Sequence, residues 1–340
     1  MIALRHWLLM LLWAVPPWLA AQDKYGGELF EFPGDAQSVA MAGVGVARSH
    51  EAATGFYNPA QLALVSQPSI MLAHREQFGG IVSADLLAIN LRGTSELAVQ
   101  VGLVRRGVND IPDTREALLD LNGDGVLDDN ERLDPDKIRY FDQREWGVLL
   151  SVARRHQPGW GWGVNVKLLG NWLADELGLG LGFDLGIRRD LSPALSLGLM
   201  LQDITTTQVY WSTGRWATTA PRATAGLGWQ LTLPIVQWHL ALEGELTTRF
   251  DGLRLEQAFA LGPASVLIRT GGELAINDNL RLRVGSATLF PLTLGAGLTF
   301  SAFSLDYAYV GNTRAGVFQP THQLSVTLFL ETLRELLEAG

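Results

Sequence analysis

The chain has 340 residues, of which 47% are hydrophobic and 18% are charged, and its formal net charge is −9. This acidic balance argues against a protein that binds nucleic acid through a basic surface. The sequence contains no cysteine, which excludes disulfides, thiolate catalysis and a lipid anchor attached to cysteine. The length suits two ordinary domains or one large barrel.

Residues 1–21 have the features of a secretory signal peptide. Arg5 and His6 precede the apolar segment Leu8–Val15, which is too short to span a bilayer and is followed by Pro16. Small residues then lead to a plausible cleavage site after Ala21. We therefore predict an exported protein whose mature chain begins at residue 22.

Residues 22–66 have no regular alternation of polar and apolar residues. Ser38–Ala47 is rich in glycine, alanine and valine, and Asn58 and Pro59 mark a turn that opens a short helix. This irregular stretch does not fit a spanning strand. We predict an N-terminal hatch-like segment that a wide barrel accommodates.

The clearest periodic pattern lies within residues 160–189. Trp162, Val164, Val166 and Leu168 alternate with glycine, asparagine and lysine, and a period of two indicates β-strands. These runs reach about 10–12 residues, the length of a tilted strand that crosses a bilayer, whereas strands of globular proteins usually have about 5–6. The alternative is a long hairpin in a large soluble β-protein.

Similar alternation recurs across residues 67–330. It predicts an all-β fold, a transmembrane antiparallel β-barrel of about fourteen strands in contact with the lipid of the bacterial outer membrane. One crossing is predicted within residues 252–275, and more than one crossing there would allow a barrel of sixteen strands. With both termini in the periplasm, the long connections 107–143, 205–220 and 311–321 are extracellular. The other crossings are predicted at 69–76, 80–92, 96–106, 144–155, 160–172, 177–189, 194–204, 221–232, 236–249, 278–287, 291–300, 302–310 and 322–330.

The extracellular loop 107–143 contains a calcium-type motif. Residues 120–131 fit the pattern D-x-[DN]-x-[DN]-G-x5-E at every position. Ca²⁺ takes six to eight oxygen ligands, and Gly125 permits the sharp bend that such a loop needs. We predict a structural Ca²⁺, without the two long helices of a complete EF-hand, because Pro112 and Pro135 flank the loop. The predicted ligands are Asp120, Asn122, Asp124, the carbonyl of Val126, Asp128 and Glu131.

No nucleophile motif or zinc-ligand spacing is present in the sequence, so we predict no catalytic residue and no enzyme. Inward charges such as Asp184 and Arg283 are expected to line a polar lumen. Tyr210, Trp211 and Trp216 in the 205–220 loop fit a partner-binding surface or, equally, the upper aromatic girdle of the barrel.

Residues 331–340 follow the last predicted strand. Leu330, Leu333 and Leu337 recur at helical spacing. We predict a short periplasmic amphipathic helix that packs on the barrel rim or on a partner. The alternative is a frayed terminus.

Several segments resemble the PorV/PorQ proteins, relatives of FadL-type outer-membrane barrels. The similar stretches include KYGGELFEF, AQSVAMAGVGVA and AATGFYNPAQLAL near the N-terminus, and Asp203–Thr207 followed by Trp211–Gly214. The sequence departs from the family at Phe56–Gln61, where the family more often has Tyr-Trp-Asn-Pro-Ala-Gly.

The resemblance to PorV/PorQ implies a component of type IX secretion. Such a component binds the C-terminal signal domains of secreted cargo and passes the cargo to other subunits of the secretion apparatus. The FadL relationship implies instead a passive channel for hydrophobic molecules. A third interpretation is a structural barrel that displays a calcium-bound loop.

Overall fold

We describe the fold from a computed structural model. It describes residues 28–31, 34–48, 51–65, 67–92, 96–250, 257–261, 264–288, 290–311 and 320–339. The predicted signal peptide, residues 1–21, lies outside the described residues.

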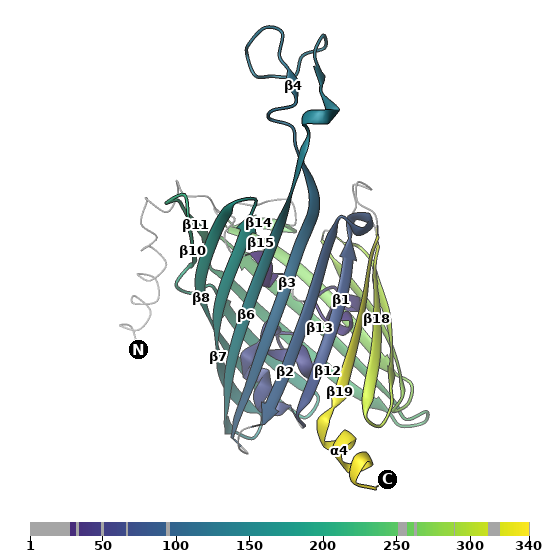
Figure 1. The fold of residues 1–340 in the computed structure, drawn as a ribbon. Helices are drawn as coiled ribbons and strands as arrows, with labels where there is room; N and C mark the ends of the chain where they lie inside the picture. The colour runs from purple at the N-terminus through teal and green to yellow at the C-terminus, as the bar shows by residue number, and fades with distance from the viewer. Residues whose placement is uncertain are drawn as a thin grey trace, which may run out of the picture.

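The chain forms a closed antiparallel β-barrel (Figure 1). Strand β1 pairs with β2 along one edge and with the last strand, β19, along the other, from Ser69 opposite Phe329 to Glu76 opposite His322. The strands of the wall are β1 (Ser69–Gln77), β2 (Val82–Arg92), β3 (Leu97–Asp113), β6 (Arg139–Gln157), β7 (Trp160–Leu173), β8 (Glu176–Asp190), β9 (Leu195–Gln202), β10 (Thr207–Trp211), β11 (Trp216–Thr219), β12 (Arg222–Leu233), β13 (Trp238–Arg249), β14 (Phe259–Leu261), β15 (Ala264–Ala275), β16 (Leu280–Ala287), β17 (Thr293–Thr299), β18 (Phe303–Val310) and β19 (Thr321–Phe329).

Within the described residues, these segments make 14 crossings, as the alternation predicted. Strands β9 and β10 form one interrupted crossing, because both pair with β8, and β11 and β12 form the next. The interruption lies at Asp203 and Thr206, whose φ angles are +55° and +56°. Within residues 252–275, the part of the chain that the structure describes contributes one crossing, β15.

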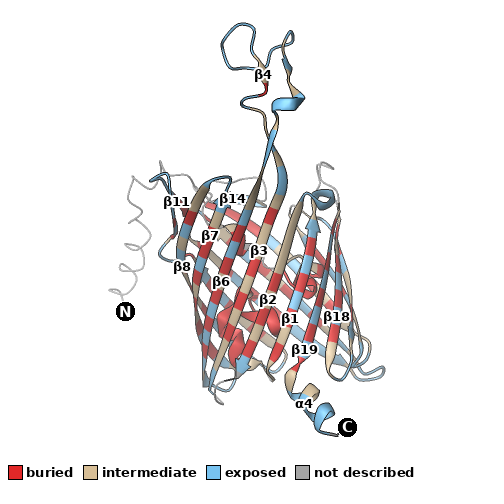
Figure 2. Cartoon of the chain, in the orientation of Figure 1, coloured by how far each residue is buried: buried red, intermediate tan, exposed pale blue. Residues whose placement is uncertain are grey.

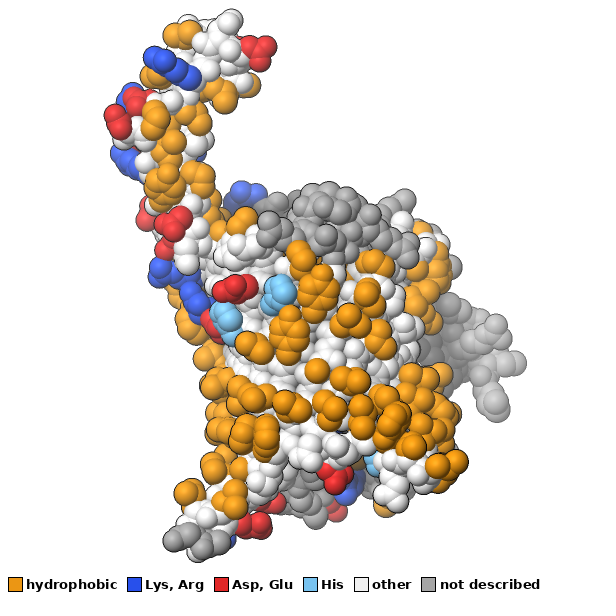
Figure 3. Space-filling view, turned by 90° about the vertical axis from the view of Figure 1, so that its right-hand side faces the viewer, with side chains coloured by type: hydrophobic (Ala, Val, Ile, Leu, Met, Phe, Trp, Pro, Cys, Tyr) orange, Lys and Arg blue, Asp and Glu red, His pale blue; other side chains and the backbone are white. Residues whose placement is uncertain are grey.

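Apolar side chains face outward and polar side chains face the lumen. On β7, Trp162, Leu168 and Trp172 are exposed, whereas Asn165 and Lys167 are buried inside. Figure 2 shows the same alternation of buried and exposed residues on other strands, and Figure 3 shows apolar side chains gathered on the face of the barrel that it draws. This distribution is the one that a lipid-embedded barrel requires.

The described part of the hatch-like segment lies inside the barrel, where its short helices appear in purple in Figure 1. We call residues 28–31, 34–48 and 51–65 the plug. As predicted, Pro59 is at the start of a short helix, and the side chain of Asn58 accepts a hydrogen bond from the Ala60 N–H. The helices of the plug are η2 (Glu28–Glu31), α2 (Ala36–Ala40), η3 (Glu51–Ala53), α3 (Thr54–Tyr57) and η4 (Pro59–Leu64).

The predicted outer loop 107–143 is a strand hairpin at its base. Strands β3 and β6 stay paired up to Asp113 opposite Arg139, with an irregularity after Val108, so the hairpin rises above the rest of the wall (Figure 1). Its tip carries β4 (Leu118–Leu119), β5 (Arg132–Leu133) and η6 (Pro135–Lys137).

The predicted C-terminal helix is present as α4 (Leu330–Ala339), which leaves the opposite end of the barrel (Figure 1). Among the described residues, no helix combines the length and the apolar character needed to span a membrane.

Candidate functional site

Two carboxylates of the barrel wall hold the backbone of the plug. The Gly45 and Val46 N–H groups donate to Glu245 Oε1 over 2.7 and 2.6 Å, and the Ala47 N–H donates to Glu243 Oε1 over 2.7 Å. Both carboxylates are buried on β13. Buried charge-assisted hydrogen bonds of this kind fix the position of the segment they bind.

Amide side chains add further ties between plug and wall. Asn58 Nδ2 donates to the carbonyl of Val46 within the plug and to the carbonyl of Ile187 on β8, over 2.8 and 3.2 Å. From the wall, Asn165 Nδ2 donates to the carbonyl of Gly55 over 3.0 Å. The sequence predicted a turn at Asn58 but did not reveal that its side chain links two parts of the structure.

Glycines on the lumen face let the plug pack directly against the strands. A side chain at Gly198 would overlap the backbone of Val46, and one at Gly285 would overlap the backbone near Ala42. At these contacts the plug leaves no space between its backbone and the wall.

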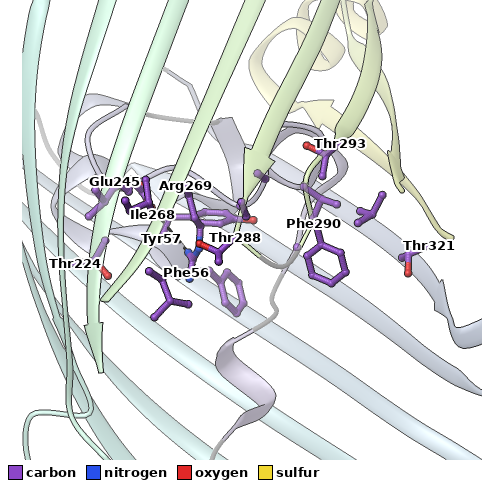
Figure 4. Close-up of a pocket in the computed structure, with 18 of the residues that line it drawn as sticks. Phe56, Tyr57, Thr224, Glu245, Ile268, Arg269, Thr288, Phe290, Thr293 and Thr321 are labelled. Atoms are coloured by element: carbon purple, nitrogen blue, oxygen red, sulfur yellow. Dashed lines mark hydrogen bonds and ion pairs between the residues drawn. The ribbon is translucent and has the colours of Figure 1, made fainter. Parts of the chain in front are cut away.

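A cavity of about 170 Å³ remains between the plug and the wall (Figure 4). For comparison, an engineered apolar cavity of about 150 Å³ binds benzene. The cavity is lined by apolar groups, including Phe30, Val39, Phe56, Leu267, Ile268, Phe290 and Val310, and by polar groups, including Tyr57, Arg75, Arg222, Glu245 and Arg269.

The polar side of the cavity is tied together by hydrogen bonds. The Tyr57 hydroxyl donates to Asp35 Oδ1 over 2.9 Å, and Arg75 Nε donates to Gln323 Oε1 over 2.9 Å. Burial, together with the charge of Asp35, raises the pKa of Tyr57 well above its ordinary value. The phenol therefore stays protonated and holds its orientation at the edge of the cavity.

The barrel wall is interrupted where the cavity reaches β15. On the edge of β15 away from β13, pairing with β16 ends at Arg269, and pairing with β14 begins at Val266. Among the described residues, Leu267 and Ile268 have no strand partner on this edge. Both line the cavity, although Ile268 lies on the outward-facing row of β15 and is 39% exposed. The cavity thus reaches the lipid-facing side of the wall.

Buried ions occupy other parts of the lumen, as the inward charges in the sequence predicted. Lys167 Nζ lies 2.6 Å from Asp184 Oδ1 and 2.8 Å from Asp203 Oδ1. A second cluster pairs Arg283 with Glu273 and Asp306 over 2.7 and 2.6 Å. These groups satisfy one another, which suits a structural network.

The Asp203–Thr207 motif builds the interruption between β9 and β10. Asp203 turns inward at this point, its N–H donates to Asp184 Oδ1 over 3.0 Å, and its carboxylate pairs with Lys167. A β-bulge commonly re-aims a side chain in this way. The motif therefore has a role inside the barrel itself.

The predicted calcium loop is curled around Asp120. Asp120 Oδ1 accepts from the Gly123 N–H over 2.6 Å, and Oδ2 accepts from the Gly125 N–H over 2.9 Å. The Gly125 and Gly123 N–H groups hold the pKa of Asp120 below its ordinary value. Glu131 closes the loop by accepting from the Leu121 N–H over 2.8 Å.

The other predicted ligands join the same loop without converging on one point. Asn122 Nδ2 donates to Asp124 and Asp128, over 3.1 and 2.9 Å, and Asp124 accepts from the Val126 N–H over 2.8 Å. Within the described residues, no three acidic, histidine or cysteine side chains lie close enough together to hold a metal ion.

The structure separates the three aromatic residues that were predicted to lie together in the 205–220 connection. Tyr210 and Trp216 are cross-strand partners on β10 and β11, their ring centroids are 5.0 Å apart, and both are exposed. Trp211 packs against the buried cluster that contains Val209. The sequence placed all three on a loop, but pairing resumes at Thr207 after the interruption and puts them on β10 and β11.

Comparison with known proteins bears on the fold. No protein-family model and no curated protein sequence matches the chain. The toluene transporter TbuX of Ralstonia pickettii is similar in structure, with a TM-score of 0.59 at 13% identity over 91% of this chain and 99% of that one. The monoaromatic hydrocarbon channel CymD gives 0.53 at 12% identity, over 86% and 96% of the two chains.

The toluene transporter TodX of Pseudomonas putida gives a TM-score of 0.51 at 13% identity, over 90% of this chain and 97% of that one. At such low identity these likenesses concern the fold. They match the FadL-type barrel that the resemblance implied, whereas membership of the PorV/PorQ group stays a prediction. The chain has the fold of these channels and is a closed antiparallel β-barrel of the bacterial outer membrane.

Proposed function

We propose that this barrel is a passive channel for small hydrophobic molecules and that it is not an enzyme. The observation that carries the proposal is the lumen cavity that reaches the interrupted wall beside β15. A channel for apolar molecules needs an apolar binding space and an exit that avoids water. The cavity supplies the first, and the unpaired edge at Leu267 and Ile268 supplies the second.

The lining of the cavity suits an aromatic or branched hydrocarbon of small size. Phe30, Phe56 and Phe290 offer ring surfaces, and most small-molecule sites are lined in this way with a few polar groups. The hydrogen bonds of Tyr57 and Arg75 to protein partners limit their attraction for a polar solute. The similar barrels TbuX, CymD and TodX are described as toluene transporters or monoaromatic hydrocarbon channels, which agrees with this substrate class.

The proposal is tested by binding of fluorobenzene to the purified barrel, followed by fluorine NMR. Ala287 lines the cavity at the wall interruption, and Ala287→Trp should fill the exit. Binding should weaken by about tenfold or more, since an added indole removes most of the space. Ala225, which is exposed on the outer face of β12, supplies the matched control Ala225→Trp.

Uptake of labelled toluene by cells that carry each variant gives the functional measurement. Ala287→Trp should lower uptake to the level of cells without the barrel, and Ala225→Trp should leave it unchanged. Parent protein that neither binds fluorobenzene nor raises toluene uptake would contradict the proposal.

The secretion role implied by the PorV/PorQ resemblance predicts cargo and apparatus subunits as partners. The resemblance rests partly on Asp203–Thr207, and this motif already has a structural role in pairing Asp203 with Lys167. The motif therefore does not require a partner protein. Affinity purification from outer membranes in mild detergent separates the two functions, because co-purified cargo signal domains would favour secretion over the channel.

We propose, in addition, that the outer loop binds a structural Ca²⁺. The support is the complete motif at residues 120–131 and the turn around Asp120, where the N–H groups of Gly123 and Gly125 fix the first ligand. On this proposal, the six predicted ligands draw together around the ion and order the tip of the β3–β6 hairpin.

A further inference from the structure

A row of polar side chains crosses the outside of the barrel where apolar residues are expected. His74, Asp85, Arg105 and Trp146 are successive cross-strand partners on β1, β2, β3 and β6. Asp85 links its two neighbours, with Oδ1 2.8 Å from His74 Nδ1 and Oδ2 accepting from Arg105 Nη1 over 3.0 Å. The Arg105 guanidinium also lies 5.9 Å from the centre of the Trp146 ring.

The row below on the same strands is apolar. Leu72, Leu87 and Leu103 are cross-strand partners directly beneath the polar row. Leu324 and Val326 of β19 extend this surface, and the residues enclose an outer groove of about 380 Å³. Figure 3 shows histidine and acidic side chains above an apolar band on the face that carries β1 and β19.

Exposed charges on a lipid-facing wall are unfavourable near the bilayer centre and tolerated near its interfaces. His74, Asp85 and Arg105 have side-chain exposures of 54%, 45% and 30%. Because they lie toward the end of the strands that carries the outer hairpin, they mark the boundary between the acyl chains and the headgroups of the outer leaflet.

A second pocket, of about 700 Å³, lies above the groove at the base of the outer hairpin. Trp146 lines both, so the groove and the pocket adjoin at its indole ring. In the upper pocket, Arg144 is the cross-strand partner of Trp172 and pairs with Asp142 over 2.7 Å. Tyr140 adds another aromatic surface.

We propose that the groove and the upper pocket together bind one glycolipid of the outer leaflet. An acyl chain lies between Leu72, Leu87 and Leu103, and the sugar headgroup lies against Trp146 and the polar row. A sugar presents hydroxyl groups that both donate and accept, together with an apolar ring face. The site offers carboxylates and guanidinium groups in alternation beside indole rings, which matches those properties.

The charges favour a sugar over a bare phosphate. Asp85 lies between His74 and Arg105, and Asp142 lies beside Arg144, so an anion would approach a carboxylate along with each cation. The lower half of the site continues the apolar surface of the barrel wall, which favours a lipid over a soluble saccharide.

The test uses native mass spectrometry of the full barrel in mild detergent with rough lipopolysaccharide or with phosphatidylethanolamine. The parent should retain one glycolipid in preference to the phospholipid. Trp146→Ala should weaken retention by about tenfold or more, as truncation of a central aromatic anchor commonly does. Trp162→Ala is the matched control, because Trp162 is 41% exposed and Trp146 is 39% exposed, on neighbouring strands.

A second variant, a check of folding and a second form of the lipid complete the experiment. Arg105→Gln should also reduce retention, and heat-modifiable gel mobility verifies that each variant is folded. Dephosphorylated lipopolysaccharide should bind as well as the intact lipid. Equal retention by the Trp146 and Trp162 variants, preference for the phospholipid, or loss of binding on dephosphorylation would each overturn the proposal.

Discussion

Replacement of Lys167 by methionine should destabilise the barrel strongly, because it leaves the buried Asp184 without its cation and leaves Asp203 with only the more distant Arg222, 3.8 Å away. The ammonium lies 2.6 Å from Asp184 and 2.8 Å from Asp203, and all three side chains are about 2% exposed. It also lies 5.6 Å from the ring centre of Phe30 in the plug. Removing one partner of a buried ion pair costs about 3–5 kcal/mol, so we expect a loss of that size in the free energy of unfolding.

The measurement is urea unfolding of the barrel in phospholipid vesicles, followed by tryptophan fluorescence and heat-modifiable mobility. Arg334→Met is the control, since its pair with Glu338 on α4 is largely exposed and exposed pairs contribute little. Adding Asp184→Asn and Asp203→Asn to Lys167→Met should recover much of the lost stability. A loss below about 1 kcal/mol for Lys167→Met would refute the argument, because it is the size expected of an exposed pair.

The remaining predictions concern the lipid face, the tail and the outer loop. Leu181→Arg on the outer face of β8 should lower the free energy of unfolding by about 2–4 kcal/mol, whereas Gln77→Arg in the polar lumen should lower it much less. Equal losses for the two variants, measured by unfolding in lipid vesicles, would contradict the assignment of the inner and outer faces. Deletion of residues 332–340 should leave membrane insertion intact, and failure to insert would assign the tail to the assembly signal. Ca²⁺ should protect the loop from limited proteolysis in the parent but not in Glu131→Gln; identical cleavage of the parent with Ca²⁺ and with chelator would count against the ion.

The sequence alone determined the barrel, because apolar and polar side chains alternate residue by residue along each strand. Trp162, Val164, Val166 and Leu168 face lipid only if the chain is extended, and each is separated from the next by a lumen residue. The inward charges, the turn at Asn58 and the C-terminal helix are also local patterns. Each of these features can be predicted because it depends on residues that lie close together in the sequence.

The candidate channel was decided by tertiary structure. The cavity combines Phe30 and Phe56 of the plug with Ile268 and Phe290 of the wall, and no spacing in the sequence relates these residues. The wall interruption arises because β14 and β16 meet the same edge of β15 without filling it. Which residues of neighbouring strands pair with one another depends on registers that the closure of the whole barrel sets.

The proposed outer lipid site was likewise decided by the tertiary structure. In the sequence, four residues on four different strands each face outward without any evident relation to one another, namely His74, Asp85, Arg105 and Trp146. Pairing in the sheet places them side by side and sets the leucine row directly below. The sequence determined which way each side chain faces, since that follows from the pleat of one strand. Only the tertiary structure decided which side chains meet, because cross-strand neighbours are fixed by the register between strands.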